Sequence, residues 1–418
     1  MQMLSETVVH RLASACRSTL TLVLGGRFER VLLPVLAIVG ANMTAFGALM
    51  GYFGLWLIEA RHADIGAVST ALLLAGLAGA AGAFAAGSAV DRYGARGMIV
   101  GISALHVLAT AVLALPVDTW VGVGALVAIA GTQPLRGVAQ RTLIGLLSDA
   151  GTGEKSFADF RLVLNVGLLC GPVLGAGLLL WGWEALRIGV CALYALSLLP
   201  AVALYRDRRI GAHSGTSTSS AAAPVPAASM LTDRRLLLLL AGSGSAWTIV
   251  YVYESLIPIL VVSSHAVSAS EWGLIYSLGP LLCLVGQFRV QRWFRGFSTA
   301  SRLTGGVLLM GFAFSLFWEG FALGSLLLFI VAFVLGDMVW GPASEALVVR
   351  VAPEGRTGAY VGAVTSTMWV GSAVAPAVGL PAREHYGDGV IWIATAGLAL
   401  VAAACYAKAN QLVCANNP

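Results

Sequence analysis

Long apolar segments separated by short polar stretches dominate the chain. Twelve such segments are present, and each is long enough to cross a bilayer, which takes about 20 mainly apolar residues per helix. They lie at about residues 32–58, 66–90, 98–117, 120–147, 160–181, 185–205, 236–262, 272–294, 303–318, 322–349, 357–381 and 388–407. These runs lack the alternating polarity of membrane β-strands. The pattern therefore predicts an all-α integral membrane protein with twelve transmembrane helices.

The composition agrees with burial in a membrane. Of the 418 residues, 58% are hydrophobic and 11% are charged, whereas an ordinary soluble domain has about 25% charged residues. A soluble fold of this composition could not solvate its surface, so the bilayer has to be the solvent. The net charge of +5 does not indicate a nucleic-acid partner, because the basic residues follow the membrane topology.

The basic residues predict the orientation of the chain. If the N-terminus lies inside the cell, 20 of the 25 Lys and Arg residues fall on the cytoplasmic side and three fall outside, while Arg136 and Arg141 lie within the fourth helix. Loops rich in Lys and Arg face the cytoplasm. Both termini are therefore predicted to be cytoplasmic. The many Ala and Gly residues, beside two lysines only, favour a bacterial source and its inner membrane.

A polar stretch divides the chain into two halves. Residues 206–235 hold Ser, Thr, Ala and Pro between two arginine clusters, a composition typical of a flexible cytoplasmic linker. We therefore expect an N-terminal six-helix bundle over residues 31–205 and a C-terminal six-helix bundle over residues 236–408. Residues 1–30 lack an apolar core followed by a cleavage site, so they are predicted, like residues 409–418, to be a cytoplasmic tail.

The two halves share a weak internal repeat. An offset of 204 residues superposes Gly167, Gly171, Pro172 and Gly175 on Gly371, Ala375, Pro376 and Gly379. A parallel repeat of this kind is typical of two pseudo-symmetric bundles related by an axis along the membrane normal. It predicts a substrate site near the midplane between the two bundles.

A short loop after the second predicted helix carries a motif. The segment Gly87-Ser88-Ala89-Val90-Asp91-Arg92-Tyr93-Gly94-Ala95-Arg96 resembles the loop signature of the major facilitator superfamily, with Ala95 replacing a basic residue. Gly87 and Gly94 allow close packing and a tight turn, and Asp91 can accept hydrogen bonds from a nearby helix start. Arg92 and Arg96 are expected to stay at the cytoplasmic surface. The equivalent segment after the eighth helix, Gly286 to Arg292, lacks the Asp.

Two further motifs resemble the same superfamily. Gly167, Gly171, Pro172 and Gly175 resemble the fifth-helix element of its proton-coupled antiporters, in which small residues and a proline let one bundle rock on another. Arg136 is similar to the arginine of the fourth-helix signature, although Ala139-Gln140 stands where Gln-Gly is expected. The resemblance covers about residues 31–408 and looks most like the drug:proton antiporter branch. It implies the major facilitator fold, and export rather than import.

Charged side chains inside the predicted spans are candidates for proton coupling. A charge at the bilayer centre costs about 2.5–3.5 kcal/mol on insertion scales, so Arg136, Glu254 and Asp337 should face a cavity or a partner. The offset of 204 residues relates Arg141 to Glu345, and we expect this pair to meet when a cytoplasmic gate closes. His106 lies alone in the third helix, where a hydrogen bond to a neighbouring helix is the expected role.

Polar and aromatic residues on other helix faces are candidates for the substrate cavity. Trp247, Tyr251 and Glu254 recur on one face of the seventh helix, and stacking there suits a moderately apolar or cationic ligand. The alternative is that the aromatic rings only pack against a neighbouring helix. Gln133, Arg136 and Gln140 share a face of the fourth helix. The predicted cavity residues are Asn42, Phe46, Gln133, Gln140, Trp247, Tyr251 and Trp340.

These features favour a secondary transporter that works by alternating access. We expect proton-coupled efflux of a drug-like or natural-product molecule, driven by a proton gradient, with no cofactor, metal or nucleotide. The expected partners are the substrate, protons and the lipid bilayer, without nucleic acid, and the expected state is a monomer. The main alternative is a proton-coupled importer of a small metabolite or sugar. A membrane-embedded enzyme is not indicated, because the six histidines are dispersed, whereas a sensor or scaffold could use the same fold.

Overall fold

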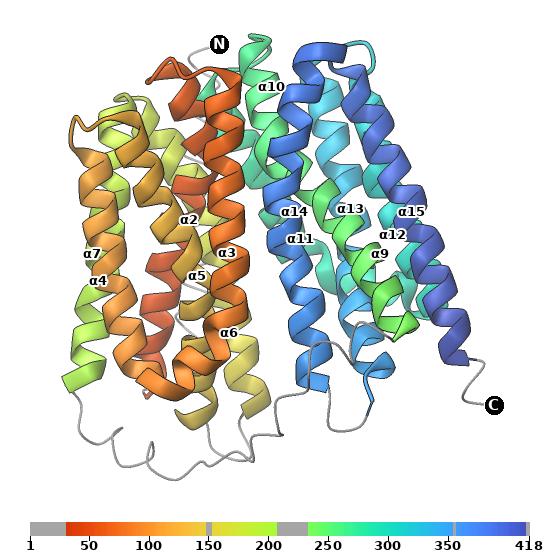
Figure 1. Ribbon diagram of the computed structural model, residues 1–418, viewed down its shortest axis with the longest axis horizontal. Helices are drawn as coiled ribbons and strands as arrows, with labels where there is room; N and C mark the ends of the chain where they lie inside the picture. The colour runs from red at the N-terminus through yellow and green to blue at the C-terminus, as the bar shows by residue number, and fades with distance from the viewer. Residues whose placement is uncertain (1–30, 148–152, 207–232, 354–356, 415–418) are drawn as a thin grey trace. The chain divides into compact units, whose positions relative to one another are not determined.

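The computed structural model describes residues 31–147, 153–206, 233–353 and 357–414 (Figure 1). The predicted N-terminal tail, nearly all of the predicted linker and the end of the C-terminal tail lie outside these residues. The helices are α2 (Leu33–Glu59), α3 (Ile65–Tyr93), α4 (Ala95–Ala114), α5 (Thr119–Leu147), α6 (Gly153–Leu179), α7 (Trp183–Arg206), α9 (Arg234–Tyr251), η2 (Val252–Leu256), α10 (Ile257–Ser263), α11 (Ala269–Trp293), η3 (Phe294–Gly296), α12 (Thr299–Ala313), η4 (Phe314–Phe317), α13 (Leu323–Val351), α14 (Thr357–Tyr386) and α15 (Gly389–Cys414).

Twelve helical segments in the described ranges are long and apolar enough to cross a membrane. This confirms the predicted number of spans and most of the predicted bounds. The helix ends differ most at α6, which begins at Gly153 rather than near residue 160, and at α15, which continues to Cys414 rather than ending near residue 407. Hydropathy marks the part of a helix that lies in lipid, whereas helical hydrogen bonds continue through the polar residues beyond it.

The helices form two compact units that do not coincide with the two halves of the sequence. Unit 1 comprises Met1–His62, Ala85–Ser217 and Val267–Pro280, and unit 2 comprises Ala63–Phe84, Thr218–Ala266 and Leu281–Pro418. Helices α3 and α11 therefore each contribute to both units. The division into bundles at residues 31–205 and 236–408 stays a prediction.

Glycines let α2 and α6 approach closely within unit 1. A Cβ atom on Gly167 would lie 2.7 Å from the Met43 Cβ, and one on Gly171 would lie 2.7 Å from the Thr44 carbonyl oxygen. The Tyr52 hydroxyl also donates a hydrogen bond of 2.9 Å to the Pro172 carbonyl. The close packing expected of this motif is thus confirmed.

The repeated positions have the same role in unit 2, where α14 packs against α9. A Cβ atom on Gly371 would lie 2.8 Å from the Thr248 nitrogen, and one on Gly379 would lie 2.4 Å from a methyl group of Leu256. The offset of 204 residues that relates Gly167 to Gly371 therefore relates two helix contacts of the same kind.

Alanine substitutions on α6 should have effects of opposite sign. Gly177 has no atom within 4 Å of an added Cβ, so Gly177→Ala should raise the free energy of unfolding by about 0.5–1 kcal/mol. Gly171→Ala should lower it by about 1–3 kcal/mol, because backbone atoms of α2 would have to move. Thermal unfolding of the two detergent-solubilised variants checks this, and equal shifts in both would contradict close packing at Gly171.

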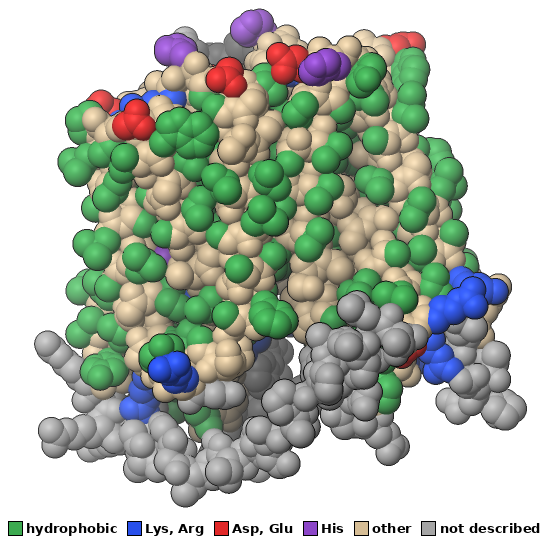
Figure 2. Space-filling model, viewed as in Figure 1, with side chains coloured by type: hydrophobic (Ala, Val, Ile, Leu, Met, Phe, Trp, Pro, Cys, Tyr) green, Lys and Arg blue, Asp and Glu red, His purple; other side chains and the backbone are tan. Residues whose placement is uncertain are grey.

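The outer surfaces of the helices are apolar between their ends. Figure 2 shows hydrophobic side chains along the helices and charged side chains near the helix ends. Phe84 is 91% exposed and Phe288 is 83% exposed, values that suit contact with lipid rather than water.

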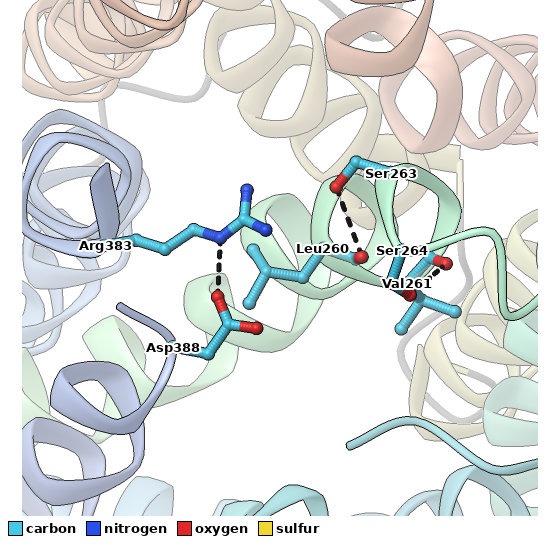
Figure 3. Close-up of polar contacts among 6 residues, drawn as sticks. All are labelled: Leu260, Val261, Ser263, Ser264, Arg383 and Asp388. Atoms are coloured by element: carbon cyan, nitrogen blue, oxygen red, sulfur yellow. Dashed lines mark hydrogen bonds and ion pairs between the residues drawn. The ribbon is translucent and has the colours of Figure 1, made fainter. Parts of the chain in front are cut away.

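A polar cluster lies at the turn between α14 and α15 in unit 2 (Figure 3). The Arg383 Nε and the Asp388 Oδ1 are 2.6 Å apart and form an ion pair across this turn. At the nearby end of α10, the Ser263 and Ser264 hydroxyls donate to the carbonyls of Leu260 and Val261. The Leu260 carbonyl also accepts the Ser264 backbone N–H, so the two hydroxyls add side-chain hydrogen bonds to the last turn of α10.

Candidate functional site

Glu254 lies in a local irregularity of the seventh span. Residues 252–256 form a π-helix between α9 and α10, in which the Ile257 N–H donates to the Val252 carbonyl. Pro258 has no N–H to donate to the Glu254 carbonyl, four residues earlier. Single π-helical turns inside α-helices are frequent at functional sites. The sequence therefore places the Glu254 carboxyl on a turn whose geometry differs from the regular helix around it.

Aromatic side chains cluster on the same helix. The Trp247 ring lies 6.4 Å from the Tyr251 ring and 5.5 Å from the Trp340 ring, centroid to centroid, and meets the latter edge to face. The Trp340 indole N–H donates to the Tyr406 hydroxyl at 3.1 Å, and Trp340 is 1% exposed. Trp247 and Tyr251 are half-buried. Trp340, predicted to line the cavity, is thus buried and packs edge to face against Trp247.

Two carboxyl groups of unit 2 share one environment. Glu254 of η2 and Asp337 of α13 are both half-buried, and their charges interact. Glu345, also on α13 but exposed, interacts with Asp337 in the same way. Within the described parts of the chain, neither Glu254 nor Asp337 has a hydrogen-bond or ion-pair partner. Like charges without a cation favour binding of a proton or of a cationic ligand.

Arg136 lies in unit 1 and is fully buried at 0% exposure. Its Nη2 donates to the His106 Nδ1 and, at 3.5 Å, to the Ile102 carbonyl, both on α4. The Tyr194 ring of α7 lies 5.8 Å from the guanidinium carbon. Arg136 therefore faces α4 and α7 rather than an open cavity, and its partner is an imidazole.

His106 holds α4 against α5. A guanidinium can only donate, so the His106 Nδ1 accepts, and the His106 Nε2–H donates to the Thr132 hydroxyl at 2.8 Å. The expected hydrogen bond from His106 to a neighbouring helix is thus confirmed. The Nε and Nη1 atoms of Arg136 have no partner among the described residues. The sequence signal for the pair was weak, because it consisted of one histidine and one arginine in different apolar spans.

The other predicted cavity residues of unit 1 do not share the contacts of Arg136. The Gln133 amide donates to the Asn42 side-chain oxygen at 3.4 Å and so connects α5 to α2. Gln140 is fully buried, and neither of its amide atoms has a partner in the described part of the chain. Phe46 is half-buried on α2. Positions three apart on a helix differ by about 60° in direction, which explains how Gln133 and Arg136 reach different neighbours.

Unit 1 also contains a small apolar recess that sequence reasoning missed. It lies between α2, α4 and α7, and Tyr52, Trp56, Thr110 and Val190 are among its lining residues. Thr110 donates to the His106 carbonyl at 2.7 Å. The recess has no sequence signal of its own, because its lining residues come from three separate helices.

Comparison with known proteins agrees with this architecture. The chain matches the Major Facilitator Superfamily over residues 31–376. It belongs to the major facilitator superfamily. It is 28% identical over 360 residues to the multidrug resistance protein MdtH of Aeromonas hydrophila, covering 81% of this chain and 82% of the relative. It is also 24% identical over 239 residues to the uncharacterized MFS-type transporter YttB of Bacillus subtilis, a match that spans 56% of this chain and 59% of that relative.

Solved structures of other transporters share the fold. A POT family transporter crystallised with 5-aminolevulinic acid superposes with a TM-score of 0.76 at 14% identity, covering 94% of this chain and 98% of that one. A point mutant of the nucleoside transporter NupG gives a TM-score of 0.76 at 12% identity, covering 91% of this chain and 100% of that one. These likenesses show the twelve-helix transporter fold, and the relatives are transporters rather than enzymes.

The superfamily loop motif, Gly87 to Arg96, covers the end of α3, the connecting Gly94 and the start of α4. Gly94 has a φ of 74° directly before α4, a conformation that favours glycine, so the expected tight turn is confirmed. Arg92 is exposed and lies 5.4 Å from the Tyr93 ring, while Arg96 is half-buried. Among the described residues, no atom lies within 4 Å of a Cβ added at Gly87, so close packing at this position stays a prediction. The Asp91 side chain lies outside those described.

The predicted gate pair is divided between the two units. Arg141 of α5 is exposed and lies 5.9 Å from the Phe160 ring within unit 1. Glu345 of α13 is exposed in unit 2. A contact between Arg141 and Glu345 in a closed state stays a prediction.

Proposed function

We propose that this superfamily member is a proton-coupled transporter that exports amphipathic cations by alternating access. The observation that carries the proposal is that Glu254 and Asp337 interact electrostatically in unit 2, and that the span of Glu254 also carries the half-buried Trp247 and Tyr251. Two acids that have no basic partner among the described residues can exchange a proton for a cationic substrate, and the aromatic rings can hold its apolar part. The likeness to proteins named multidrug resistance protein MdtH supports this substrate class.

The second candidate is proton-coupled import of a small metabolite. The structural likeness to a POT family transporter and to the nucleoside transporter NupG favours it, although at these identities the likeness concerns the fold alone. Both candidates use the same acids, and they differ in the direction of proton movement relative to the substrate. The proposed setting for either is the inner membrane of a bacterium, with both termini in the cytoplasm and the chain acting as a monomer.

Transport by purified protein in liposomes distinguishes these candidates. The liposomes contain a pH-sensitive dye and carry an imposed proton gradient, and ethidium, a dipeptide, a nucleoside and a sugar are added in turn. We expect ethidium to move opposite to protons. Movement of a dipeptide, nucleoside or sugar in the same direction as protons, without any response to ethidium, would establish the importer instead.

A further inference from the structure

Helix α13 lacks one of its own hydrogen bonds at Pro342. Proline has no backbone N–H, so the carbonyl four residues earlier, that of Met338, loses its helical donor. Met338 is 4% exposed. A buried carbonyl without a hydrogen-bond donor lowers the stability of the fold. Asp337 directly precedes it.

Two amides of α11 take the place of the missing donor. The Nε2 atoms of Gln287 and Gln291 lie 3.3 and 2.5 Å from the Met338 carbonyl oxygen. A carbonyl oxygen has two lone pairs and cannot donate, so both amides are donors. A Cβ atom on Gly286 would lie 3.3 Å from the Met338 methyl group, so the helices approach closely at this level.

One face of α11 is directed at this part of α13. Cys283, Gln287 and Gln291 follow one another at intervals of four residues and therefore share a helix face. Cys283 interacts electrostatically with Asp337, while the two glutamines bind the Met338 carbonyl. The α11 face thus contacts the Met338 peptide group directly, and its Cys283 lies within electrostatic range of the preceding acid.

We propose that Gln287 and Gln291 form a clamp that replaces the broken helical bond of α13 and positions Asp337 for proton exchange. The clamp fixes the peptide group of Met338 from a second helix, so it fixes the backbone that carries the Asp337 side chain. The positioning role rests on the proposed function of Asp337, whereas the clamp itself does not. The clamp also assigns a role to the segment from Gly286 to Arg292, where the equivalent of the superfamily loop motif lacks the Asp.

Selective labelling reports on the Met338 carbonyl directly. Met338 is followed by Val339, and no other methionine of the chain precedes a valine. Protein labelled with [1-13C]Met and [15N]Val should therefore give a single carbonyl cross-peak in a three-dimensional HNCO spectrum of the full chain in detergent. We expect this carbonyl resonance to move in Gln287→Leu and Gln291→Leu, and to move further in the double variant. The control Phe288→Leu, on the lipid-exposed side of α11, should leave it in place.

Replacing Pro342 should compensate for the loss of the two glutamine donors. Pro342→Ala restores a backbone N–H that can donate to the Met338 carbonyl. The double glutamine substitution should therefore lower the melting temperature when Pro342 is present, and lower it much less in the Pro342→Ala background. An unmoved carbonyl resonance in the double glutamine variant, or equal losses of melting temperature in the two backgrounds, would overturn the clamp.

Transport tests the positioning role separately. In liposomes, the double glutamine variant should drive ethidium against a proton gradient about tenfold more slowly at saturating ethidium, a rate loss equivalent to one lost hydrogen bond. Its KM for ethidium should stay unchanged, and Pro342→Ala should restore the rate. A moved carbonyl resonance with an unchanged transport rate would refute the positioning role and leave the clamp. If wild-type protein fails to couple ethidium to protons, the proposed function fails, while the spectra and melting temperatures still decide the clamp.

Discussion

Replacing Glu254 by Gln, or Asp337 by Asn, should abolish proton-driven ethidium transport while the protein still folds. Each change keeps the shape of the side chain but removes its ability to exchange a proton. A positioned proton-transfer group contributes about 100-fold to 10,000-fold to a rate, so a loss of at least about 100-fold is expected for each variant. The measurement is the initial rate of dye-reported proton movement when ethidium is added to proteoliposomes.

An exposed carboxylate provides the matched control for this pair. Glu384→Gln removes an acid from α14 that is exposed to solvent, and it should transport like the wild type. Binding of ethidium, followed by quenching of tryptophan fluorescence, should weaken in Glu254→Gln because Trp247 and Tyr251 share a helix face with the acid. Proton-coupled transport at the wild-type rate in both Glu254→Gln and Asp337→Asn would show that neither acid is individually required.

The membrane architecture was readable from the sequence because it depends on length and hydropathy. An apolar run of about 20 residues has few alternatives to a membrane-spanning helix. The contact between α2 and α6 was also predictable at Gly171, since close helix approach needs residues without large side chains. The positive φ at Gly94 follows equally from a local rule.

Only those features of the candidate site that lie within a single helix were predictable from the sequence. The sequence placed Trp247, Tyr251 and Glu254 on one face, but the π-helix at residues 252–256 also depends on how α14 packs against this span. The sequence placed Arg136 inside a span, yet the choice of His106 as its partner is a tertiary contact between helices. Gln287 carried no signal, because its acceptor is a backbone carbonyl 51 residues later.

Replacing His106 by Leu should lower the free energy of unfolding by about 1.5–3 kcal/mol, the contribution of a hydrogen bond to a charged group. Arg136 is fully buried, and its Nε and Nη1 atoms already lack partners in the described part of the chain. Losing the His106 acceptor would leave the charge, among the described residues, with the Ile102 carbonyl and the Tyr194 ring. Thermal unfolding of the detergent-solubilised protein checks this, with the exposed His385→Leu as the matched control.

The second substitution determines what the buried charge is for. Arg136→Met in the His106→Leu background removes both polar partners, and replacing both by apolar groups of similar shape is nearly neutral. We therefore expect the double variant to unfold close to the wild-type temperature. If the double variant is no more stable than His106→Leu, the charge of Arg136 is not the cause of the loss. The stable double variant lacks Arg136, so its transport rate tests the predicted role of Arg136 in proton coupling separately from its role in folding. Loss of coupled transport would assign Arg136 to the transport cycle. Coupling at the wild-type rate would exclude Arg136 from proton coupling.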